Sequence, residues 1–452
     1  MPRDEDVELT QRVEELLRAH GMMGRVEQLR ALSGGASRET WSLDLVAEDG
    51  THPLILQRTR AGTSGGGPGM AEEAELIRAA QALGVPVPTV VAADPGPALG
   101  APCVVMDRLD GETIARKLLR DDRWRVARSV LVGQAGVALA AIHRIDPGVA
   151  PGLRATDQLE EMTALLERAG QPLPAFELAM RWLRANRPSS PRQTVVHGDF
   201  RLGNLLVADA GLAGVLDWEL AHLGDPIEDL GWYCVRAWRF GSALPAGGMG
   251  TREELIAAYE AAGGGPVEPD VLRWWEMLGT LKWGLICIVQ AQVHLSGAAR
   301  SVELATIGRR VCENEWDVLA LLPGELPEPS PTVPTTEDTL YGRPTAGELV
   351  EAVREWVDRD VRSATEGRVS FHARVAVNAL AMVERELALG VGHRVAHAAR
   401  LASIGCADDD DLVARICSGA FDARAEEIRA VVAASVRDKL EVANPRWLEP
   451  DE

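Results

Sequence analysis

His197-Gly198-Asp199-Phe200-Arg201-Leu202-Gly203-Asn204 and, after a short gap, Leu216-Asp217-Trp218-Glu219 form the stretch of sequence that decides the fold. Residues 192–197 are apolar enough to predict a short strand, which ends in a turn because Gly198 can adopt backbone angles that other residues avoid. Two further short strands are expected at 205–207 and 214–216. The stretch therefore predicts three short strands whose connecting loops carry the polar residues.

Three polar side chains in this stretch have the order and spacing of a phosphoryl-transfer site. Asp199 and Asn204 flank one loop, and Asp217 leaves the next strand towards the same cleft. The first aspartate can accept the proton of an attacking hydroxyl, while the asparagine and the second aspartate can hold the Mg²⁺ ions that bridge the phosphates of ATP. Hard oxygen ligands on converging loops suit magnesium. The pattern is typical of the catalytic loop of a kinase, although His-Gly-Asp alone would fit a polar turn equally well.

These residues resemble the aminoglycoside phosphotransferase and choline kinase-like family of small-molecule kinases. The similarity extends over roughly residues 1–325 and is most specific at 197–231. It implies a bilobal α+β fold like that of protein kinases, with a small β-rich N-lobe and a mainly helical C-lobe. It also implies that Asp199 is the catalytic base and that Asn204 and Asp217 bind the metal.

Within this family, the block is similar to a branch that occurs alone in bacteria or fused to acyl-CoA dehydrogenases. That similarity implies a hydroxyacyl-CoA or a hydroxy acid as the phosphate acceptor. An aminoglycoside or a choline-like amino alcohol is the alternative. No long loop separates Asp217 from Asp229, and protein kinases use such a loop to dock peptides. We therefore expect a small-molecule acceptor.

The chain is expected to have four parts: a nucleotide-binding N-lobe at 1–109, a catalytic and acceptor-binding C-lobe at 110–322, a Pro-rich linker at 323–342 and a small all-α domain at 343–452. Proline-rich segments that are poor in core-forming residues act as semi-rigid linkers. The last part resembles a helical domain of unassigned function that follows this type of kinase in some bacteria. Dimerisation or partner docking is its expected role.

Apolar periodicity predicts helices and strands on both sides of the linker. In the N-lobe we expect helices at 7–20 and 71–83 and strands at 26–33, 39–46, 54–57, 87–92 and 103–106. In the C-terminal domain we expect helices at 349–361, 371–389 and 428–440.

Two segments of the N-lobe are candidates for nucleotide binding. A small glycine-containing turn between the first two strands, made of Ser33, Gly34, Gly35 and Ser37, would let backbone N–H groups approach the ATP phosphates. The resemblance further implies that the last strand leads into the hinge between the lobes. Met106 would then lie at the hinge, with the backbone of Asp107 and Leu109 at the adenine edge.

The chain departs from the kinase pattern in its third strand. Protein kinases place a lysine there, paired with a helix glutamate, to grip the α- and β-phosphates. This chain has no lysine before Lys117, and the strand ends in Gln57 and Arg58. Strand alternation places Gln57 and Arg58 on opposite faces. Because related sequences carry an arginine in place of the lysine, Arg58 is our candidate, but the choice between the two residues stays open.

Two further charged groups complete the predicted phosphate site. Glu73 is the expected partner of Arg58, with Glu72 and Glu75 as alternatives. Arg201 lies two residues after Asp199, where protein kinases use a lysine near the γ-phosphate, so we predict a catalytic role for it.

Other polar and aromatic residues near the block are expected to be structural. Asp225 and Asp229 should cap helices and brace the catalytic loop, and His143 should be a structural histidine. The helices after Gly231 are rich in tryptophan. A tryptophan cage could hold a quaternary ammonium group by cation–π attraction, but core packing is the favoured interpretation.

Composition limits the classes of function. The 452-residue chain has 46% hydrophobic and 25% charged residues and a net charge of −20. Such acidity argues against nucleic acid and against an anionic membrane surface as partners. The N-terminus lacks a signal-peptide pattern and six cysteines are scattered without metal-type spacing, so we expect a cytoplasmic protein with reduced thiols.

A nucleotide-binding pseudokinase scaffold is the rival interpretation. The missing strand lysine favours it. The intact set of Asp199, Asn204 and Asp217 argues against it, because a scaffold has no chemical need for all three side chains.

Overall fold

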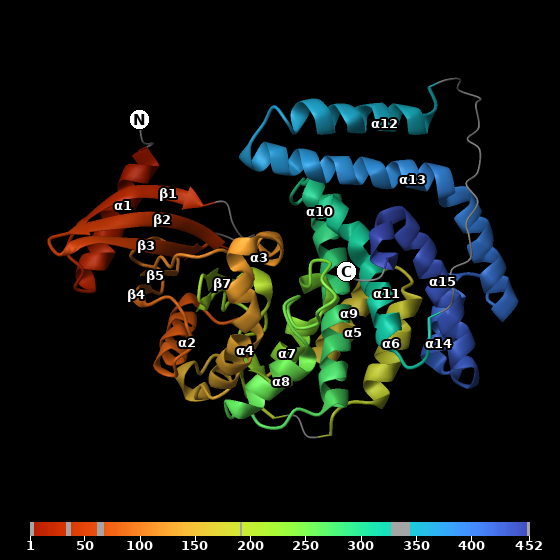
Figure 1. Cartoon of the computed structure of the whole chain (residues 1–452), viewed down its shortest axis with the longest axis horizontal. Coiled ribbons are helices and arrows are strands. Elements are labelled where there is room, and N and C mark those ends of the chain that lie inside the picture. The colour runs from red at the N-terminus through yellow and green to blue at the C-terminus, as the bar shows by residue number, and fades with distance from the viewer. Residues whose placement is uncertain (1–3, 33–37, 61–66, 190–191, 327–343, 450–452) are drawn as a thin grey trace. The chain divides into compact units, whose positions relative to one another are not determined.

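The computed structural model describes residues 4–32, 38–60, 67–189, 192–326 and 344–449. The chain divides into two compact units (Figure 1): unit 1 contains Met1–Asp157 and Pro188–Glu276, and unit 2 contains Gln158–Arg187 and Met277–Glu452. Unit 2 groups helices of the predicted C-lobe with those of the predicted C-terminal domain. The boundaries that the sequence suggests between these parts therefore stay predictions.

Unit 1 begins with a five-stranded antiparallel sheet and two helices, as the sequence predicts for an N-lobe. The strand order is β1-β2-β3-β5-β4. The elements are α1 (Asp4–Ala19), β1 (Arg25–Leu32), β2 (Arg38–Ala47), β3 (Gly50–Thr59), α2 (Met70–Ala82), β4 (Val90–Asp94) and β5 (Cys103–Asp107) (Figure 1).

Alternation along β3 separates the two faces of this sheet. Leu54 and Leu56 are fully buried in one core cluster with Leu16 and Leu17 of α1. Burying a leucine side chain contributes about 1.5–3 kcal/mol, so this pattern strongly fixes which face of β3 meets α1. Gln57, the neighbour of Leu56, consequently lies on the opposite face.

The rest of unit 1 carries the predicted catalytic block. β6 pairs with β9 and β7 pairs with β8, each pair antiparallel, and α4 packs against α8. The elements are α3 (Ala115–Arg120), α4 (Arg125–Ile142), β6 (Thr194–Val196), β7 (Leu205–Ala208), β8 (Gly211–Val215), β9 (His222–Gly224), α7 (Ile227–Cys234), α8 (Arg252–Ala261), the start of α9 (Pro269–Leu295), and short 3₁₀ turns at Asp122–Trp124, Pro147–Val149, Leu202–Asn204 and Arg236–Trp238.

Unit 2 is helical throughout its described residues. α12 and α13 run side by side (Figure 1), α13 packs on α15, and α6 contacts α11, α14 and α15. The elements are α5 (Gln158–Arg168), α6 (Pro174–Ala185), the end of α9, α10 (Val302–Ile307), α11 (Val311–Leu321), α12 (Ala346–Trp356), α13 (Gly367–Ile404), α14 (Asp409–Ser418), α15 (Ala425–Ala443), 3₁₀ turns at Gly308–Arg310, Asp422–Arg424 and Pro445–Leu448, and a π-helical turn at Val357–Val361. The three predicted helices of the C-terminal part are confirmed.

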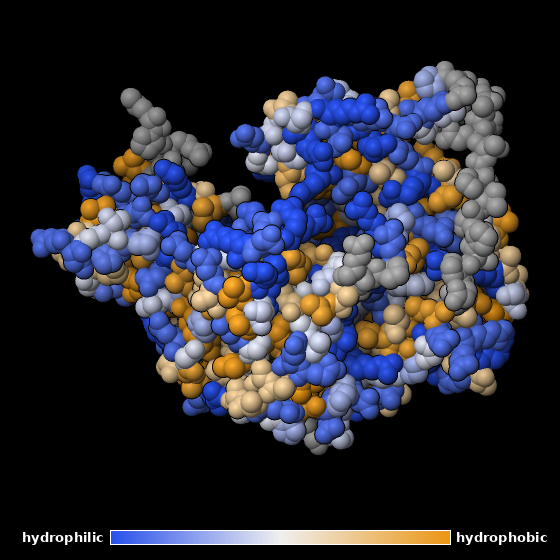
Figure 2. Space-filling view, viewed as in Figure 1, coloured by the Kyte–Doolittle hydropathy of each residue, from blue (hydrophilic) through white to orange (hydrophobic). Residues whose placement is uncertain are grey.

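The face of the molecule seen in Figure 2 is mostly hydrophilic, with hydrophobic residues in scattered patches. Among the described residues, one helical segment, Asp122–Ile142, is long and apolar enough to cross a membrane. More than half of its apolar window is buried, and α4 packs on α8. These are the properties of a core helix.

The contact between α4 and α8 gives a test of the packing. A Cβ added at Gly136 would lie 2.8 Å from the Ala258 Cβ and 2.9 Å from the Leu255 carbonyl oxygen. We expect Gly136→Ala to lower the free energy of unfolding by about 1–3 kcal/mol, measured by chemical denaturation, because the helices must move apart.

Gly133, on the same helix, is the matched control because nothing lies within 4 Å of its added Cβ. Gly133→Ala should raise stability by about 0.5–1 kcal/mol through helix propensity. Equal stabilisation by both variants would show that α4 and α8 are not in this close contact.

Candidate active site

The loop after β6 is anchored by one buried carboxylate. The backbone N–H groups of His197 and Gly198 donate to the two oxygens of Asp229, at 2.8 and 2.9 Å. Gly198 has φ +78°, and a Cβ there would lie 2.3 Å from the Leu220 carbonyl oxygen. Glycine is therefore required at this turn, and the direction in which Asp199 projects is fixed.

Two further side chains, His143 and Tyr259, hold the Asp229 carboxylate, which anchors the loop, in position. His143 Nε2 lies 3.1 Å from Asp229 Oδ2, and His143 Nδ1 lies 2.9 Å from the hydroxyl of Tyr259, which belongs to α8. Burial by itself would raise the pKa of Asp229, but the hydrogen bond and charge of His143, together with His197, lower it overall. The geometry agrees with the structural roles expected for Asp229 and His143.

Asp199 is held by three side-chain donors. Arg201 Nε and Trp232 Nε1 lie 3.0 and 2.8 Å from its Oδ1. Asn204 Nδ2 lies 2.6 Å from its Oδ2 and 3.0 Å from its backbone oxygen. Asp199 and Asn204 are both buried. The sequence-predicted base, asparagine and arginine are thus brought into direct contact.

His197 connects this loop to the segment that carries Asp217. Its Nε2 lies 3.1 Å from the Leu216 carbonyl oxygen, and its Nδ1 accepts the Asp199 N–H at 3.3 Å. Burial lowers the pKa of His197, so the ring is neutral and can donate on one side while it accepts on the other. Asp217 itself has φ +66°, a left-handed conformation that aspartate tolerates better than most residues.

Negative charge accumulates around Asp217. Burial, and after it the charge of Glu219, raises the pKa of Asp217 to about 6; Asp199 and Glu73 act in the same direction and Arg38 opposes them. A partly buried carboxylate among other carboxylates suits a divalent cation, which would neutralise the excess negative charge. Because Asn204 Nδ2 is committed to Asp199, its amide oxygen and the Asp217 carboxylate are the groups that fit a magnesium ion.

The predicted pairing of Arg58 with Glu73 is wrong. Arg58 pairs with Glu39 at 2.7 Å and lies over the Trp41 ring at 5.0 Å. Glu73 pairs instead with Arg38, the first residue of β2, at 2.7 Å. The reason is the alternation of β3: Arg58 shares the parity of Leu54 and Leu56, which face α1, so its side chain starts on the wrong face to reach Glu73.

The neighbours of Glu73 have other partners. Glu72 accepts the Gly152 N–H at 2.7 Å, and Glu75 pairs with Arg78. Of the three glutamates considered from the sequence, Glu73 is the buried one that meets an arginine from the sheet.

The remaining predicted nucleotide residues belong to the end of the sheet. Met106 is buried in β5 opposite Ile55, and Leu109 follows that strand. The Asp107 N–H donates to the Thr89 carbonyl oxygen at 3.0 Å, so this N–H is already paired within the sheet. Ser33, Gly34, Gly35 and Ser37 lie outside the described residues.

Sequence reasoning missed Trp232, Trp238 and Arg38. Trp232 donates to the predicted base, and Trp238 lies under the Arg201 guanidinium at 4.8 Å. A signal for Trp232 existed: it lies three residues after Asp229 on one helix, so both side chains share a face. Because the cation over the Trp238 ring is the guanidinium of Arg201, this ring gives no support to a tryptophan cage for a quaternary ammonium group of the substrate.

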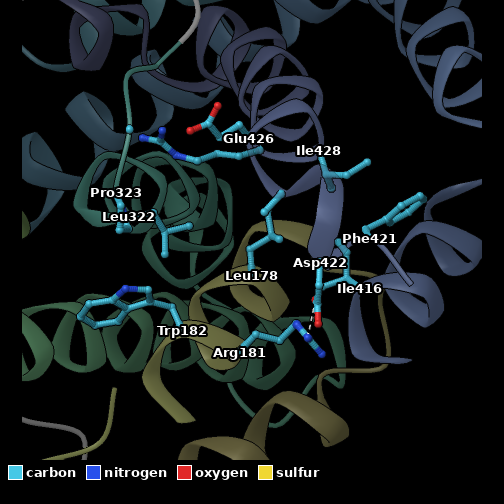
Figure 3. Close-up of a pocket in the computed structure, with 13 residues that line it drawn as sticks. Leu178, Arg181, Trp182, Leu322, Pro323, Ile416, Phe421, Asp422, Glu426 and Ile428 are labelled. Atoms are coloured by element: carbon cyan, nitrogen blue, oxygen red, sulfur yellow. Dashed lines mark hydrogen bonds and ion pairs between the residues drawn. The ribbon is translucent and has the colours of Figure 1, made fainter. Parts of the chain in front are cut away.

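Among the described residues of unit 2 there are also pockets that include none of the predicted site residues. The pocket in Figure 3, of about 340 Å³, is lined by apolar and charged residues of α6, α14 and α15 and of the segments after α11 and α14. Leu178, Ile416 and Phe421 contribute to its wall. Another, of about 450 Å³, has a more polar lining from the same unit. The candidate active site is the group of polar residues around Asp199 and Asp217 in unit 1.

Comparison with known families agrees with the site geometry. The model of the phosphotransferase enzyme family (APH) matches residues 28–275. This range includes Asp199, Asn204, Asp217 and the residues described above as their partners. Residues 363–447 match a domain of unknown function, DUF6285. The predicted family and fold are therefore confirmed, as is the presence of a C-terminal domain of unassigned function, while the predicted boundaries between the parts of the chain stay predictions.

Individual relatives are more distant. The chain is 29% identical to acyl-CoA dehydrogenase family member 10 of Mus musculus over 48% of its length, and 27% identical to family member 11 of Homo sapiens over 41%. It spans only 21% and 26% of the length of these two relatives. A structure from Ralstonia eutropha, described as an aminoglycoside phosphotransferase, has a TM-score of 0.56 at 22% identity, covering 68% of this chain and 97% of that one. This last likeness concerns the fold alone.

Two buried aspartates with opposite pKa shifts give a test of the anchor. Because the folded-state pKa of Asp229 is lowered, its ionised form stabilises the fold above the ordinary pKa of about 4, and this contribution is lost as pH falls through the lower folded value. Asp229→Asn should cost about 2–4 kcal/mol at pH 7 in urea denaturation, since an amide NH₂ would face backbone donors.

Asp225→Asn is the matched control. Burial raises the pKa of Asp225, so removing its charge relieves a cost instead of adding one. We expect a much smaller loss of stability at pH 7, and the Asp229→Asn deficit should shrink below about pH 4. Equal deficits for the two variants at pH 7 would contradict the anchor role of Asp229.

Proposed function

The chain belongs to the phosphotransferase enzyme family, and from this premise we propose that it transfers the γ-phosphoryl group of ATP to a hydroxyl group of a small molecule. The observation that carries the proposal is the fixed position of Asp199, whose two carboxylate oxygens accept hydrogen bonds from Arg201, Trp232 and Asn204. A base held in one orientation suits a reaction in which positioning supplies most of the catalysis.

In the proposed reaction, Asp199 accepts the proton of the acceptor hydroxyl while that oxygen attacks the γ-phosphorus. The bond to the oxygen that bridges the β- and γ-phosphates breaks, and ADP leaves with that oxygen. Magnesium, held by Asn204 and Asp217, would neutralise charge on the phosphate oxygens. Arg201 lies beside Asp199 and has a planar guanidinium that can move to a phosphate oxygen when substrates bind.

For the acceptor, we propose a hydroxyacyl-CoA or a hydroxy acid. The support is the similarity to relatives named acyl-CoA dehydrogenase family members, although the chain spans only a small share of their length. An aminoglycoside or amino alcohol is the second candidate, favoured by the acidic net charge of −20, which would attract a cationic substrate. A pseudokinase scaffold would show nucleotide binding without transfer. The cytoplasmic location stays a prediction.

The decisive experiment measures ADP formation from ATP and Mg²⁺ with a panel of acceptors: 4-hydroxyacyl-CoAs, free hydroxy acids, choline, homoserine and aminoglycosides. With the accepted compound, Asp199→Asn should lower kcat by about 10²- to 10⁴-fold, the usual contribution of a positioned base. Asp217→Asn should raise the Mg²⁺ concentration needed for half-maximal rate, because one anionic ligand is lost.

Asp209→Asn is the control for loss of a carboxylate in the same region, because Asp209 is an exposed aspartate in the β7–β8 turn, paired with Arg123. Its kcat should match that of the wild type. Full activity of Asp199→Asn would overturn the assigned base. Nucleotide binding with no transfer to any acceptor would favour the scaffold.

For the helical part of unit 2, we propose self-association through α12 and α13. Large apolar side chains recur along one side of each helix, between 37% and 68% exposed: Leu349, Val353 and Trp356 of α12 and Val383, Leu387, Val391 and Val395 of α13. Exposed apolar side chains of this size are unfavourable in water, so covering them would stabilise an assembly. A second copy of the chain would cover both stripes.

Light scattering after size-exclusion chromatography tests this proposal. The wild type should be a dimer at micromolar concentration, and Leu387→Glu with Val391→Glu should give a monomer with unchanged helix content. The control is Val126→Glu, at an exposed position of α4 in unit 1, which should leave the dimer intact. A monomeric wild type would overturn self-association and point to a different protein as the partner.

A further inference from the structure

The face of the sheet that meets Glu73 receives no cation from β3. β3 places Ile55, Gln57 and Thr59 on that face, and none of these side chains is charged. The register of β2 and β3 explains what replaces it. Thr40 lies opposite Gln57 and Arg38 opposite Thr59, so Arg38 and Gln57 share a face, while Glu39 and Arg58 share the other.

Arg38 occupies the place where a cation is missing. Its Nη1 and Nη2 each lie 2.7 Å from one oxygen of Glu73, a two-point pairing, and its Nε lies 3.1 Å from Glu219. Both members of the Arg38–Glu73 pair are almost completely buried. Nη1 also lies 3.5 Å from the Gln57 amide oxygen, which places the guanidinium beside the position that a strand lysine would occupy.

The surroundings of Arg38 belong to the predicted metal and phosphate region. Glu219 comes two residues after Asp217. Burial by itself would lower the pKa of Arg38, but the hydrogen bond and charge of Glu73, and after them the charges of Glu219 and Asp217, raise it overall. A guanidinium has five N–H groups. Three of them are used on Glu73 and Glu219, so two remain that can donate to anionic oxygens once the weak contact with Gln57 is released.

We propose that Arg38, held by Glu73, is the residue that contacts the α- and β-phosphates of the bound nucleotide. It replaces from β2 the lysine that protein kinases supply from β3. Glu73 orients the guanidinium through a hydrogen bond from Nη1 to Oε1 and an ion pair between Nη2 and Oε2, and the N–H groups that face away from Glu73 can donate to phosphate oxygens. This inference rests on the proposed function only for the identity of the nucleotide.

Nucleotide binding, measured by calorimetry without an acceptor, tests Arg38 separately from the transfer reaction. Arg38→Ala should weaken ADP binding in the presence of Mg²⁺ by about 10- to 100-fold, the effect of losing a charge-assisted contact. Adenosine has no phosphate, and its affinity should change less than twofold. If ADP and adenosine weaken equally, Arg38 acts only on the shape of the lobe and the proposal is overturned.

A lysine introduced into β3 tests whether ADP binding can be restored in the Arg38→Ala protein. Gln57→Lys in the Arg38→Ala protein places an ammonium on the same face, next to Glu73, and should restore at least tenfold of the lost ADP affinity. Arg58→Ala, which removes the neighbouring arginine on the other face, should affect ADP binding far less than Arg38→Ala. A larger effect of Arg58→Ala, or no recovery with Gln57→Lys, would contradict the assignment.

Loss of folding must be separated from loss of binding, because Arg38→Ala leaves Glu73 buried without its partner. Arg38→Gln combined with Glu73→Gln removes both charges and avoids that cost. This double variant should unfold near the wild-type temperature yet bind ADP as weakly as Arg38→Ala. Normal ADP binding by wild type without transfer to any acceptor would refute the proposed reaction and leave the role of Arg38 intact. A wild type that binds no nucleotide would refute both.

Discussion

The buried carboxylate of Asp229 accepts the amide hydrogens of His197 and Gly198, and these two bonds fix the backbone from which Asp199 projects. A backbone N–H buried without a partner costs of the order of 1–3 kcal/mol, so the loop has a strong reason to keep this conformation. His143, which follows the last residue of α4, and Tyr259 of α8 complete the set of contacts that hold Asp229. The close packing of those two helices is therefore a requirement of the site as well as of the core.

The same helix that supplies the anchor also holds the base. α7 carries Asp229 in its first turn and Trp232 one turn later, and every residue of that helix is buried. Asp229 fixes the main chain of the loop, while the Trp232 indole fixes the side chain of Asp199. The position of Asp199 relative to its own backbone is thus set by one rigid element, with Asn204 and Arg201 completing the arrangement from within the loop.

Sequence reasoning could predict the local part of this site but not its long-range contacts. Asp199, Asn204 and Asp217 lie in one motif whose spacing reflects the chemistry, so their proximity was foreseeable. The sheet and helices of the N-lobe followed from apolar periodicity. The partner of Glu73 did not: alternation placed Arg58 and Gln57 on opposite faces, but only the β2–β3 register reveals that Arg38 lies beside Gln57. The contact of Trp232 with Asp199 could not be predicted from the residue type, because most tryptophans at helical spacing only pack in the core.

Asp217 is constrained twice, and this has a consequence for reading related sequences. Its side chain is the predicted metal ligand, and its main chain adopts φ +66°, where only glycine, asparagine and aspartate are at ease. A related protein that no longer needs the negative charge at position 217 would still need a residue that adopts this left-handed backbone conformation. Genetic drift at this position should therefore run towards asparagine or glycine and avoid glutamate, alanine and branched residues. Reading position 217 in distant members would then separate lineages that keep the chemistry from those that keep only the architecture.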